Sequence, residues 1–230
     1  MGIILLTNDD GVEGAGLWAL QGVVVSLGYE DWAIVAPLVE QSGCGHQTTT
    51  SCPIPVHQRA EQVWGIGGTP ADCTRIAVSE LFPHRIDLVL SGINDGGNLG
   101  VDIYTSGTVA AAREACFRGI PAIAISHYKI KNKQMDWEWA RHNTARVLSL
   151  LLAKPYTPNT FWNVNLPHCP EVPEPEIRFC RLSTDPLPAE YALIDGNYHY
   201  TGKYELRTRS PHTDVDVCFG GQIAVSQISI

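Results

Sequence analysis

Several signatures of exported and membrane proteins are missing from this 230-residue sequence. Its seven cysteines are scattered and none forms a CxxC pair. No apolar run approaches the length of a membrane span, and no early segment combines a basic region, an apolar core and a cleavage site. We therefore expect a cytoplasmic protein with reduced, mostly buried thiols and no membrane partner.

Charged residues are also scarce. They make up 17% of the chain against 44% apolar residues, so a sizeable core is expected and disorder is not. The net charge of −8 argues against a general binder of nucleic-acid polymers, which would carry a basic face. A small anionic substrate stays compatible with this charge, because a bound metal inverts the local charge.

The common nucleotide and metal motifs are absent as well. The turn after the first apolar segment carries Gly11, Gly14 and Gly16, and this spacing is wrong for the GxGxxG of dinucleotide-binding proteins. A Walker-type GxxxxGK[ST] is missing, which argues against an ATPase, and the eight histidines form no HExxH. Asp9 and Asp10 are adjacent, so they do not reproduce the DxD turn of phosphatases that form an aspartyl-phosphate.

The sequence contains apolar segments with strand character that alternate with helical patterns. Strands are expected at residues 3–7, 32–37, 86–93, 120–126 and 160–167, and hairpin material at 46–66. Helices are expected at 16–28, 71–82, 106–119 and 137–153. This alternation predicts an α/β fold with a parallel sheet and helices on both faces.

The last part of the chain has a different composition. Residues 168–230 are richer in proline and polar residues and end in a short alternating segment, GQIAVSQISI. We predict an α/β core over residues 1–167 that carries the site. Residues 168–230 are predicted to be a β-rich C-terminal extension rather than an independent domain.

Polar residues collect where the predicted strands end. Asn8, Asp9 and Asp10 follow the first strand, and residues 41–46, with Ser42, follow the second. Residues 91–98 end the third strand, and a helix begins soon after them. Each cluster alone is more often a turn or a helix cap. Ligands of parallel sheets bind beyond the carboxyl ends of the strands, so the coincidence of these clusters predicts a site there.

The residue types at this edge suggest a particular chemistry. Two carboxylates with amide and hydroxyl oxygens form an all-oxygen ligand set, which suits Mg²⁺ or Mn²⁺. The helix that begins near Ser106 offers free N–H groups and a favourable dipole, which suit a phosphate. Together they suggest metal-assisted phosphoryl chemistry. A regulator that binds nucleotides without hydrolysing them remains an open alternative, because binding and hydrolysis use much the same residues.

At this point the sequence resembles a known family, the SurE-type survival proteins, which are metal-dependent 5′-nucleotidases. Three motifs in this order, NDDG, SGIN-x-G-x-N and SGTV, are together highly specific. The matching segments are ILLTNDDGV, VAPLVEQSGCGH, GGTPADCTRIAV, DLVLSGINDGGNLGVDIYTSGTVAAAREA and GIPAIAIS. The tail TDVDVCFGGQIAVSQISI is similar to the closing segment of the family, whereas residues 129–210 match weakly.

The resemblance implies a Rossmann-like core with an extension that takes part in subunit exchange or dimerisation, giving a homodimer or homotetramer. It implies one divalent ion per subunit, Mn²⁺, Mg²⁺ or Co²⁺, and a nucleoside 5′-monophosphate substrate, with activity extending to 3′-nucleotides and short polyphosphate. The metal ligands it implies are Asp9, Asp10, Ser42 and Asn94. The residues it places at the phosphate are Asn8, Asn98, Ser106, Gly107 and Thr108. Asp9 and Asp10 would be catalytic: one of them would either assist the attacking water or attack phosphorus directly.

Two positions depart from the family pattern. Leu38 stands where an aspartate usually follows VAP, and Thr105 stands where a tyrosine or histidine commonly precedes SGT. Neither is an expected metal ligand, so both bear on substrate preference more than on the chemistry.

Overall fold

The computed structural model describes residues 2–130, 133–169 and 171–230. Within these residues, nine strands share one sheet and two more form a separate hairpin. The strands of the sheet are β1 (Ile3–Thr7), β2 (Trp32–Pro37), β3 (Val56–Ala60), β4 (Val63–Ile66), β5 (Ile86–Asp95), β6 (Ala122–His127), β7 (Thr160–Leu166), β8 (Ile177–Phe179) and β11 (Ile223–Ser229). The hairpin strands are β9 (Tyr191–Ile194) and β10 (Asn197–Tyr200).

The centre of the sheet is parallel, as the alternation of strands and helices predicts. The strand order is β3-β4-β2-β1-β5-β6-β7-β11-β8, and all neighbours from β4 to β7 run parallel. The sheet becomes mixed on both sides, because β3 runs antiparallel to β4 and β11 antiparallel to β7. The predicted hairpin at 46–66 is therefore confirmed as β3 and β4, and β5 runs two residues past the predicted end at residue 93.

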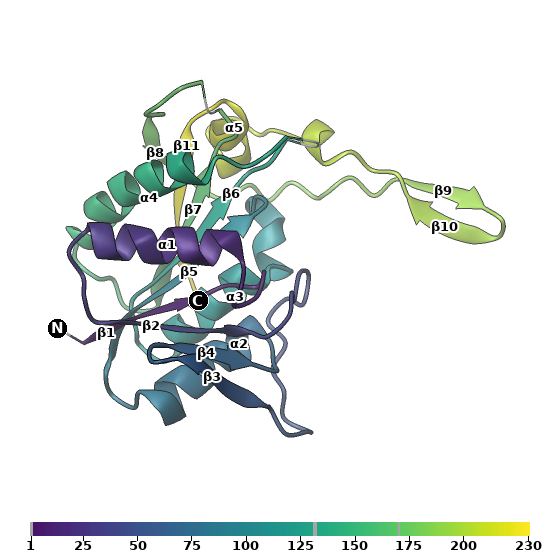
Figure 1. Ribbon diagram of the computed structural model, residues 1–230. Coiled ribbons are helices and arrows are strands. Elements are labelled where there is room, and N and C mark those ends of the chain that lie inside the picture. The colour runs from purple at the N-terminus through teal and green to yellow at the C-terminus, as the bar shows by residue number, and fades with distance from the viewer. Residues whose placement is uncertain (1, 131–132, 170) are drawn as a thin grey trace.

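Helices cover both faces of this sheet (Figure 1). The helices are α1 (Ala15–Ser26), α2 (Pro70–Ile76), α3 (Gly107–Phe117), α4 (Trp137–Leu152) and α5 (Asp214–Phe219), with short turns of other helix types at η1 (Ala77–Leu81), η2 (Gly100–Tyr104) and η3 (Tyr204–Leu206). Helices α1 and α4 pack together in one apolar core, and α2 and α3 pack on the other face in a second core. No helix in the described part of the chain is long and apolar enough to cross a membrane.

The start of α2 follows directly from its sequence. The Thr69 hydroxyl accepts from the Asp72 N–H, and the Asp72 carboxylate accepts from the Thr69 N–H, which forms a capping box. Pro70 occupies the first helical position, where its missing N–H costs nothing. The helix predicted at 71–82 differs at its other end. After Ile76 the chain widens into the π-helical turn η1, which closes with the Phe82 N–H on the Ala77 carbonyl.

Residues 168–230 contribute to the same sheet as the core. Strand β11 lies between β7 and β8. Strands β11 and β8 therefore extend the parallel sheet beyond β7. Strands β9 and β10 instead form an arm that projects away from the rest of the molecule (Figure 1). The division at residue 167, and a role of the extension in oligomerisation, stay predictions.

Candidate active site

The chain turns sharply where β1 ends. Gly11 adopts a φ of +99°, which favours glycine, and its carbonyl accepts a 2.9 Å hydrogen bond from the Asn8 side-chain amide. This contact fixes the turn that carries Asp9 and Asp10. The Asn8 side-chain oxygen is buried without a hydrogen-bond partner among the described residues. Such an atom is uncommon in folded proteins, and it lies beside the paired carboxylates.

The first turn of α3 packs directly against Asp9. The Thr108 hydroxyl donates a hydrogen bond to Asp9 Oδ1. A Cβ at Gly107 would lie 2.8 Å from the Asp9 Cβ and 3.0 Å from Cys44 Sγ, so only glycine permits this approach. The structure therefore brings Asp9, Gly107 and Thr108 together at the carboxyl edge of the sheet, as the sequence predicts.

Both carboxylates of the turn sit in an environment that disfavours charge. Asp9 is 4% exposed, and its burial raises the pKa against the opposing effect of the Thr108 hydrogen bond. Burial, and next the charge of Asp9, raise the pKa of Asp10 to about 6. Within the described residues neither carboxylate forms an ion pair. Lys129, at the same edge, pairs instead with Asp95 at 2.9 Å.

The loop after β2 reaches the same place through its backbone. The Gln41 N–H donates to the Asp9 carbonyl at 2.7 Å, which places Ser42 beside the turn. The Ser42 side chain is exposed, and its hydroxyl donates to Glu40 Oε1 at 2.7 Å. The His46 ring lies 3.0 Å from a carboxylate oxygen of Glu114, farther along α3. The ring is therefore engaged with α3 rather than with the turn that carries Asp9 and Asp10.

Asn94 lies at the end of β5, next to the paired aspartates. Its side-chain N–H donates to the Gly96 carbonyl at 2.8 Å, so the amide oxygen is the atom that can approach a cation. The following residue, Asp95, donates its backbone N–H to Asp10 Oδ2 at 3.4 Å. This contact joins the end of β5 to the turn after β1.

Ser106 and Asn98 make different kinds of contact near the start of α3. The Ser106 side-chain oxygen accepts the Val109 N–H at 3.1 Å and so caps the helix, which leaves its own proton able to bind an anion. The Asn98 amide donates to the Ser126 hydroxyl at 2.8 Å and is buried. Asn98 thus anchors its loop, and its predicted contact with phosphate stays a prediction.

Two residues that the sequence analysis did not single out complete this anchor. Asn163 and Asn165 of β7 donate to the Asn98 carbonyl at 2.9 and 3.0 Å. The Asn165 side-chain oxygen accepts the Asn98 N–H at 2.8 Å. Their signal is the NVN within the strand TFWNVNL, because residues at positions i and i+2 share one face of a strand.

The donor atoms at this edge fit a hard divalent cation. Among the described residues no three histidine, cysteine, aspartate or glutamate side chains cluster, so a site of that kind is not formed. What the edge offers is two carboxylates with amide and hydroxyl oxygens, the donors that Mg²⁺ and Mn²⁺ prefer. A cation held by Asp9 and Asp10 would also compensate one buried and one half-buried acid that lack a positive partner among the described residues.

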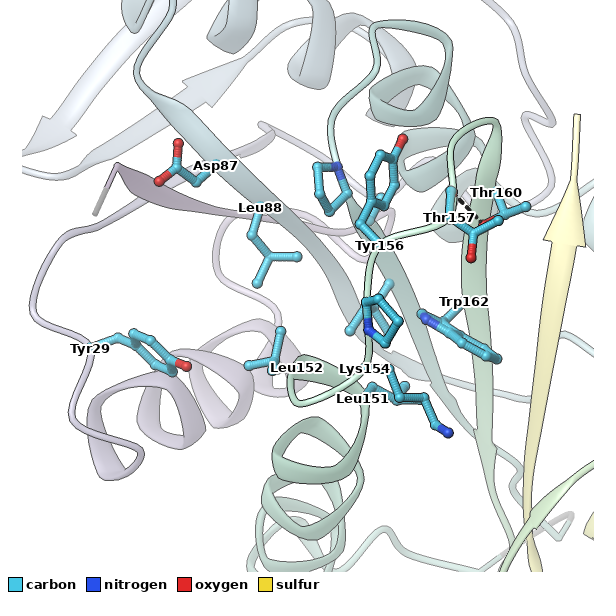
Figure 2. Close-up of a pocket in the computed structure, with 14 residues that line it drawn as sticks. Tyr29, Asp87, Leu88, Leu151, Leu152, Lys154, Tyr156, Thr157, Thr160 and Trp162 are labelled. Atoms are coloured by element: carbon cyan, nitrogen blue, oxygen red, sulfur yellow. Dashed lines mark hydrogen bonds between the residues drawn. The ribbon is translucent and has the colours of Figure 1, made fainter.

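A separate cavity of about 420 Å³ lies at the opposite edge of the sheet (Figure 2). Its walls include Leu88 of β5, Ile123 of β6 and Trp162 of β7, all near the amino ends of their strands. The polar residues described above lie at the carboxyl ends. The cavity is therefore separate from the predicted site at the carboxyl edge.

The chain matches known proteins over nearly its whole length. The family described as Survival protein SurE matches residues 4–187. A putative 5′-nucleotidase of Nostoc sp. is 49% identical over 228 residues, which are 99% of each chain. The 5′-nucleotidase SurE of Heliobacterium modesticaldum is 35% identical over 98% of this chain and 85% of its own. The crystal structure of the SurE protein from Aquifex aeolicus, 29% identical, superposes with a TM-score of 0.87 over 99% of this chain and 93% of that one.

Proposed function

Because the chain belongs to the survival protein SurE family, we propose that it is a divalent-metal-dependent 5′-nucleotidase, which hydrolyses nucleoside 5′-monophosphates to nucleoside and phosphate. The observation that carries this proposal is the first turn of α3, with Thr108 hydrogen-bonded to Asp9 beside Asp10. It places an anion-binding helix end against a pair of carboxylates. We include 3′-nucleotides and short polyphosphate as further substrates.

Four residues would hold the cation. Asp9 and Asp10 supply carboxylates, Asn94 its amide oxygen, and Ser42 a hydroxyl once it turns from Glu40. A divalent cation held there would polarise a phosphoryl oxygen and would lower the pKa of a bound water. Mn²⁺, Mg²⁺ and Co²⁺ are the ions we propose, one per subunit.

The chain itself would bind the phosphate at the start of α3. The dipole of α3 favours an anion, as do the Gly107 and Thr108 N–H groups, which face the Asp9 carboxylate. Ser106 and Gly107 lie at this turn, and the Ser106 hydroxyl proton is available to a phosphoryl oxygen. Thr108 holds Asp9 in place, and the Asn8 amide holds the turn itself. Donors fixed before the reaction stabilise the charge that develops on the phosphoryl oxygens.

We further propose a homodimer, or a homotetramer built from it, in which the β9–β10 arm contacts a second copy. The arm exposes large apolar side chains, which in a lone subunit would face water; they include Tyr191, Leu193, Ile194, Tyr198 and Tyr200. Exposed apolar clusters of this kind mark interaction surfaces. The seven cysteines are unpaired, which supports a cytoplasmic location for the enzyme.

The test is phosphate release from a panel of 5′- and 3′-nucleotides, short polyphosphate and a generic phosphomonoester. It is run with Mn²⁺, Mg²⁺, Co²⁺ or Zn²⁺, with a chelator as control. We expect chelator-sensitive release that is fastest with nucleoside 5′-monophosphates. Metal-dependent nucleotide binding without release from folded protein would contradict the proposal and leave a nucleotide sensor in its place.

A further inference from the structure

We propose that Arg207 is a positioning residue for the phosphate-binding end of α3, acting through Asp102. Arg207 lies far along the chain, in the segment that follows the β9–β10 arm. It does not touch the proposed phosphate site itself. The inference deepens the proposed function and rests on it, since it concerns how tightly that site holds phosphate.

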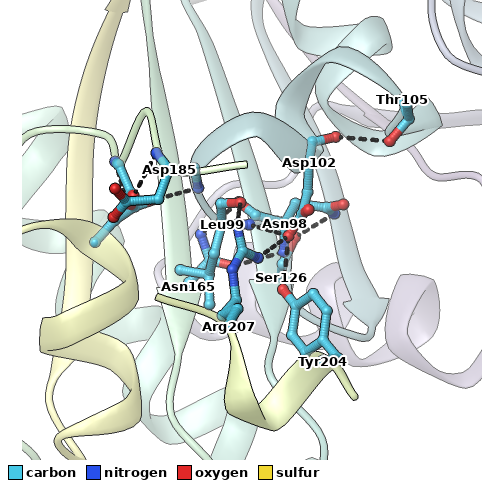
Figure 3. A network of polar contacts seen from close by, with 12 residues as sticks. Asn98, Leu99, Asp102, Thr105, Ser126, Asn165, Asp185, Tyr204 and Arg207 are labelled. Carbon is cyan, nitrogen blue, oxygen red and sulfur yellow. Dashed lines mark hydrogen bonds and ion pairs between the residues drawn. The ribbon is translucent and has the colours of Figure 1, made fainter. Parts of the chain in front are cut away.

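Arg207 and Asp102 form a buried ion pair (Figure 3). The Arg207 side chain is fully buried, and its Nη1 donates to Asp102 Oδ2 at 2.7 Å. Nη2 of the same group donates to the Leu99 carbonyl at 3.3 Å. The Tyr204 hydroxyl donates to the same Asp102 oxygen at 2.6 Å. An acid held by an arginine and a phenol at these distances has one defined position.

Backbone hydrogen bonds join Asp102 to the start of α3. The backbone carbonyl of Asp102 accepts the N–H groups of Thr105 and Ser106, both at 3.0 Å. Ser106 caps α3, and two residues later Thr108 donates to Asp9. The contacts therefore run without a gap from Arg207 through Asp102 and Ser106 to the first turn of α3.

The same C-terminal segment holds the loop a second time. Asp214 accepts the Gly100 N–H at 2.6 Å with one oxygen and the Ser183 N–H at 2.7 Å with the other. Ser183 precedes the arm, whereas Arg207 follows it. Both ends of the arm are thus fastened around the short stretch η2 that leads into α3. Nothing else in the proposed reaction requires an arginine buried at this place.

The experiment compares R207M, R207K and Y204F with a matched control, R209M. Arg209 lies two residues away, is exposed, and donates to the Glu205 carbonyl rather than to the loop before α3. The readouts are KM for a nucleoside 5′-monophosphate and the inhibition constant of inorganic phosphate. We expect R207M to raise both by roughly ten- to a hundred-fold, because small displacements of a binding group have effects of this size. R207K and Y204F should give smaller rises, and R209M none.

Each other outcome has a definite meaning. If R207M folds and its inhibition constant for phosphate is unchanged, the proposal is overturned, even if the melting temperature falls. Arg207 would then have a purely structural role. If R207M does not fold, Y204F and R207K decide, and wild-type phosphate inhibition in both overturns it. If the wild-type protein releases no phosphate from any nucleotide, the proposed function fails. The positioning role is then tested by calorimetric binding of inorganic phosphate to the same variants.

Discussion

Thr108 donates its side-chain hydrogen bond to Asp9 across 99 positions of the sequence. The first residue belongs to the start of α3, and the second to the turn that ends β1. This contact forms only when the sheet and the helix are both in place. It therefore couples the geometry of the proposed phosphate site to that of the proposed metal ligands.

Asp9→Asn should abolish most of the turnover while leaving the fold intact. The amide keeps the shape of the side chain but loses the charge that a cation would require. We expect kcat to fall by roughly 10²-fold or more, at least the loss seen when one transition-state donor is removed. The measurement is phosphate release with saturating Mn²⁺, alongside circular dichroism.

The matched control for Asp9→Asn is Asp95→Asn. Asp95 is exposed near the same edge, and its carboxylate pairs with Lys129 rather than with the turn. Activity should stay within about twofold, in line with the small energies of exposed ion pairs. Retained turnover in Asp9→Asn would contradict the assigned role of Asp9.

The metal-free protein should lose stability as the pH rises from about 4 towards 7. Burial and the charge of Asp9 raise the pKa of Asp10 to about 6, above its ordinary 3.8. The folded state therefore binds this proton more tightly than the unfolded state, and the advantage disappears as the pH passes 6. The loss should be on the order of 2 kcal/mol after allowance for the partial exposure of Asp10.

Urea unfolding at several pH values, with a chelator present, measures this loss. Asp10→Asn should flatten the profile, and equal profiles for the two proteins would refute the assignment. Adding Mn²⁺ at pH 7 should raise the melting temperature of the wild type, because a cation bound only by the folded state stabilises it.

Gly107→Ala should damage the site more than the fold. The added Cβ would lie 2.8 Å from the Asp9 Cβ, so the start of α3 or the turn after β1 must move. We expect kcat/KM to fall by roughly ten- to a hundred-fold and the protein to lose about 1–3 kcal/mol from overpacking. Steady-state kinetics and thermal unfolding measure the two effects separately.

The control for Gly107→Ala is Gly22→Ala, inside α1. The three atoms nearest a Cβ there belong to the guanidinium of Arg141, at 3.0–3.1 Å, on a flexible side chain that pairs with the exposed Glu138. Wild-type kinetics and a gain of up to about 1 kcal/mol are expected, because alanine favours a helix over glycine. If both variants have the same kinetics and stability, the close contact of Gly107 with Asp9 is not the cause of the effects measured in Gly107→Ala.

Leu193→Glu in the arm should weaken self-association. Leu193 is 64% exposed and pairs across the hairpin with Tyr198, which is 75% exposed. A charge in the middle of a buried interface costs binding energy, so the mass found by light scattering should shift towards the monomer at low concentration. His199→Gln, a polar change on the same arm, should leave the mass unchanged. If the mass of the Leu193→Glu variant is unchanged, the interface lies elsewhere on the subunit.

The sequence was sufficient for the parts of this molecule that depend on local patterns. Apolar segments such as IILLT and WAIVAP predicted central strands, because a strand that is buried on both faces accepts few residues other than apolar ones. Thr69 and Pro70 predicted the start of α2 for the same kind of local reason. The carboxyl edge then follows from the topology, so the sequence alone predicts that Asp9 and Thr108 lie near each other.

Contacts between distant segments were beyond the reach of such patterns. Arg207 lies in a polar segment with no periodicity, and only the fold reveals that it is buried against Asp102. The antiparallel insertion of β11 could not be read from its alternating sequence, which fits a strand in either direction. The hydroxyl of Ser42 likewise turns to Glu40, a choice between rotamers that no spacing encodes.

The place of β11 in the sheet has a consequence for how the molecule is made. Leu166 ends β7 and Ile223 begins β11, so residues 167–222, 56 in all, are synthesised before the second partner of β7 exists. At about 5–20 residues per second this takes roughly 3 to 11 s. During that interval the ribosome carries a nearly complete sheet with one open edge, and such edges pair readily with other chains. Nascent chains interrupted within this stretch should therefore aggregate or need a chaperone.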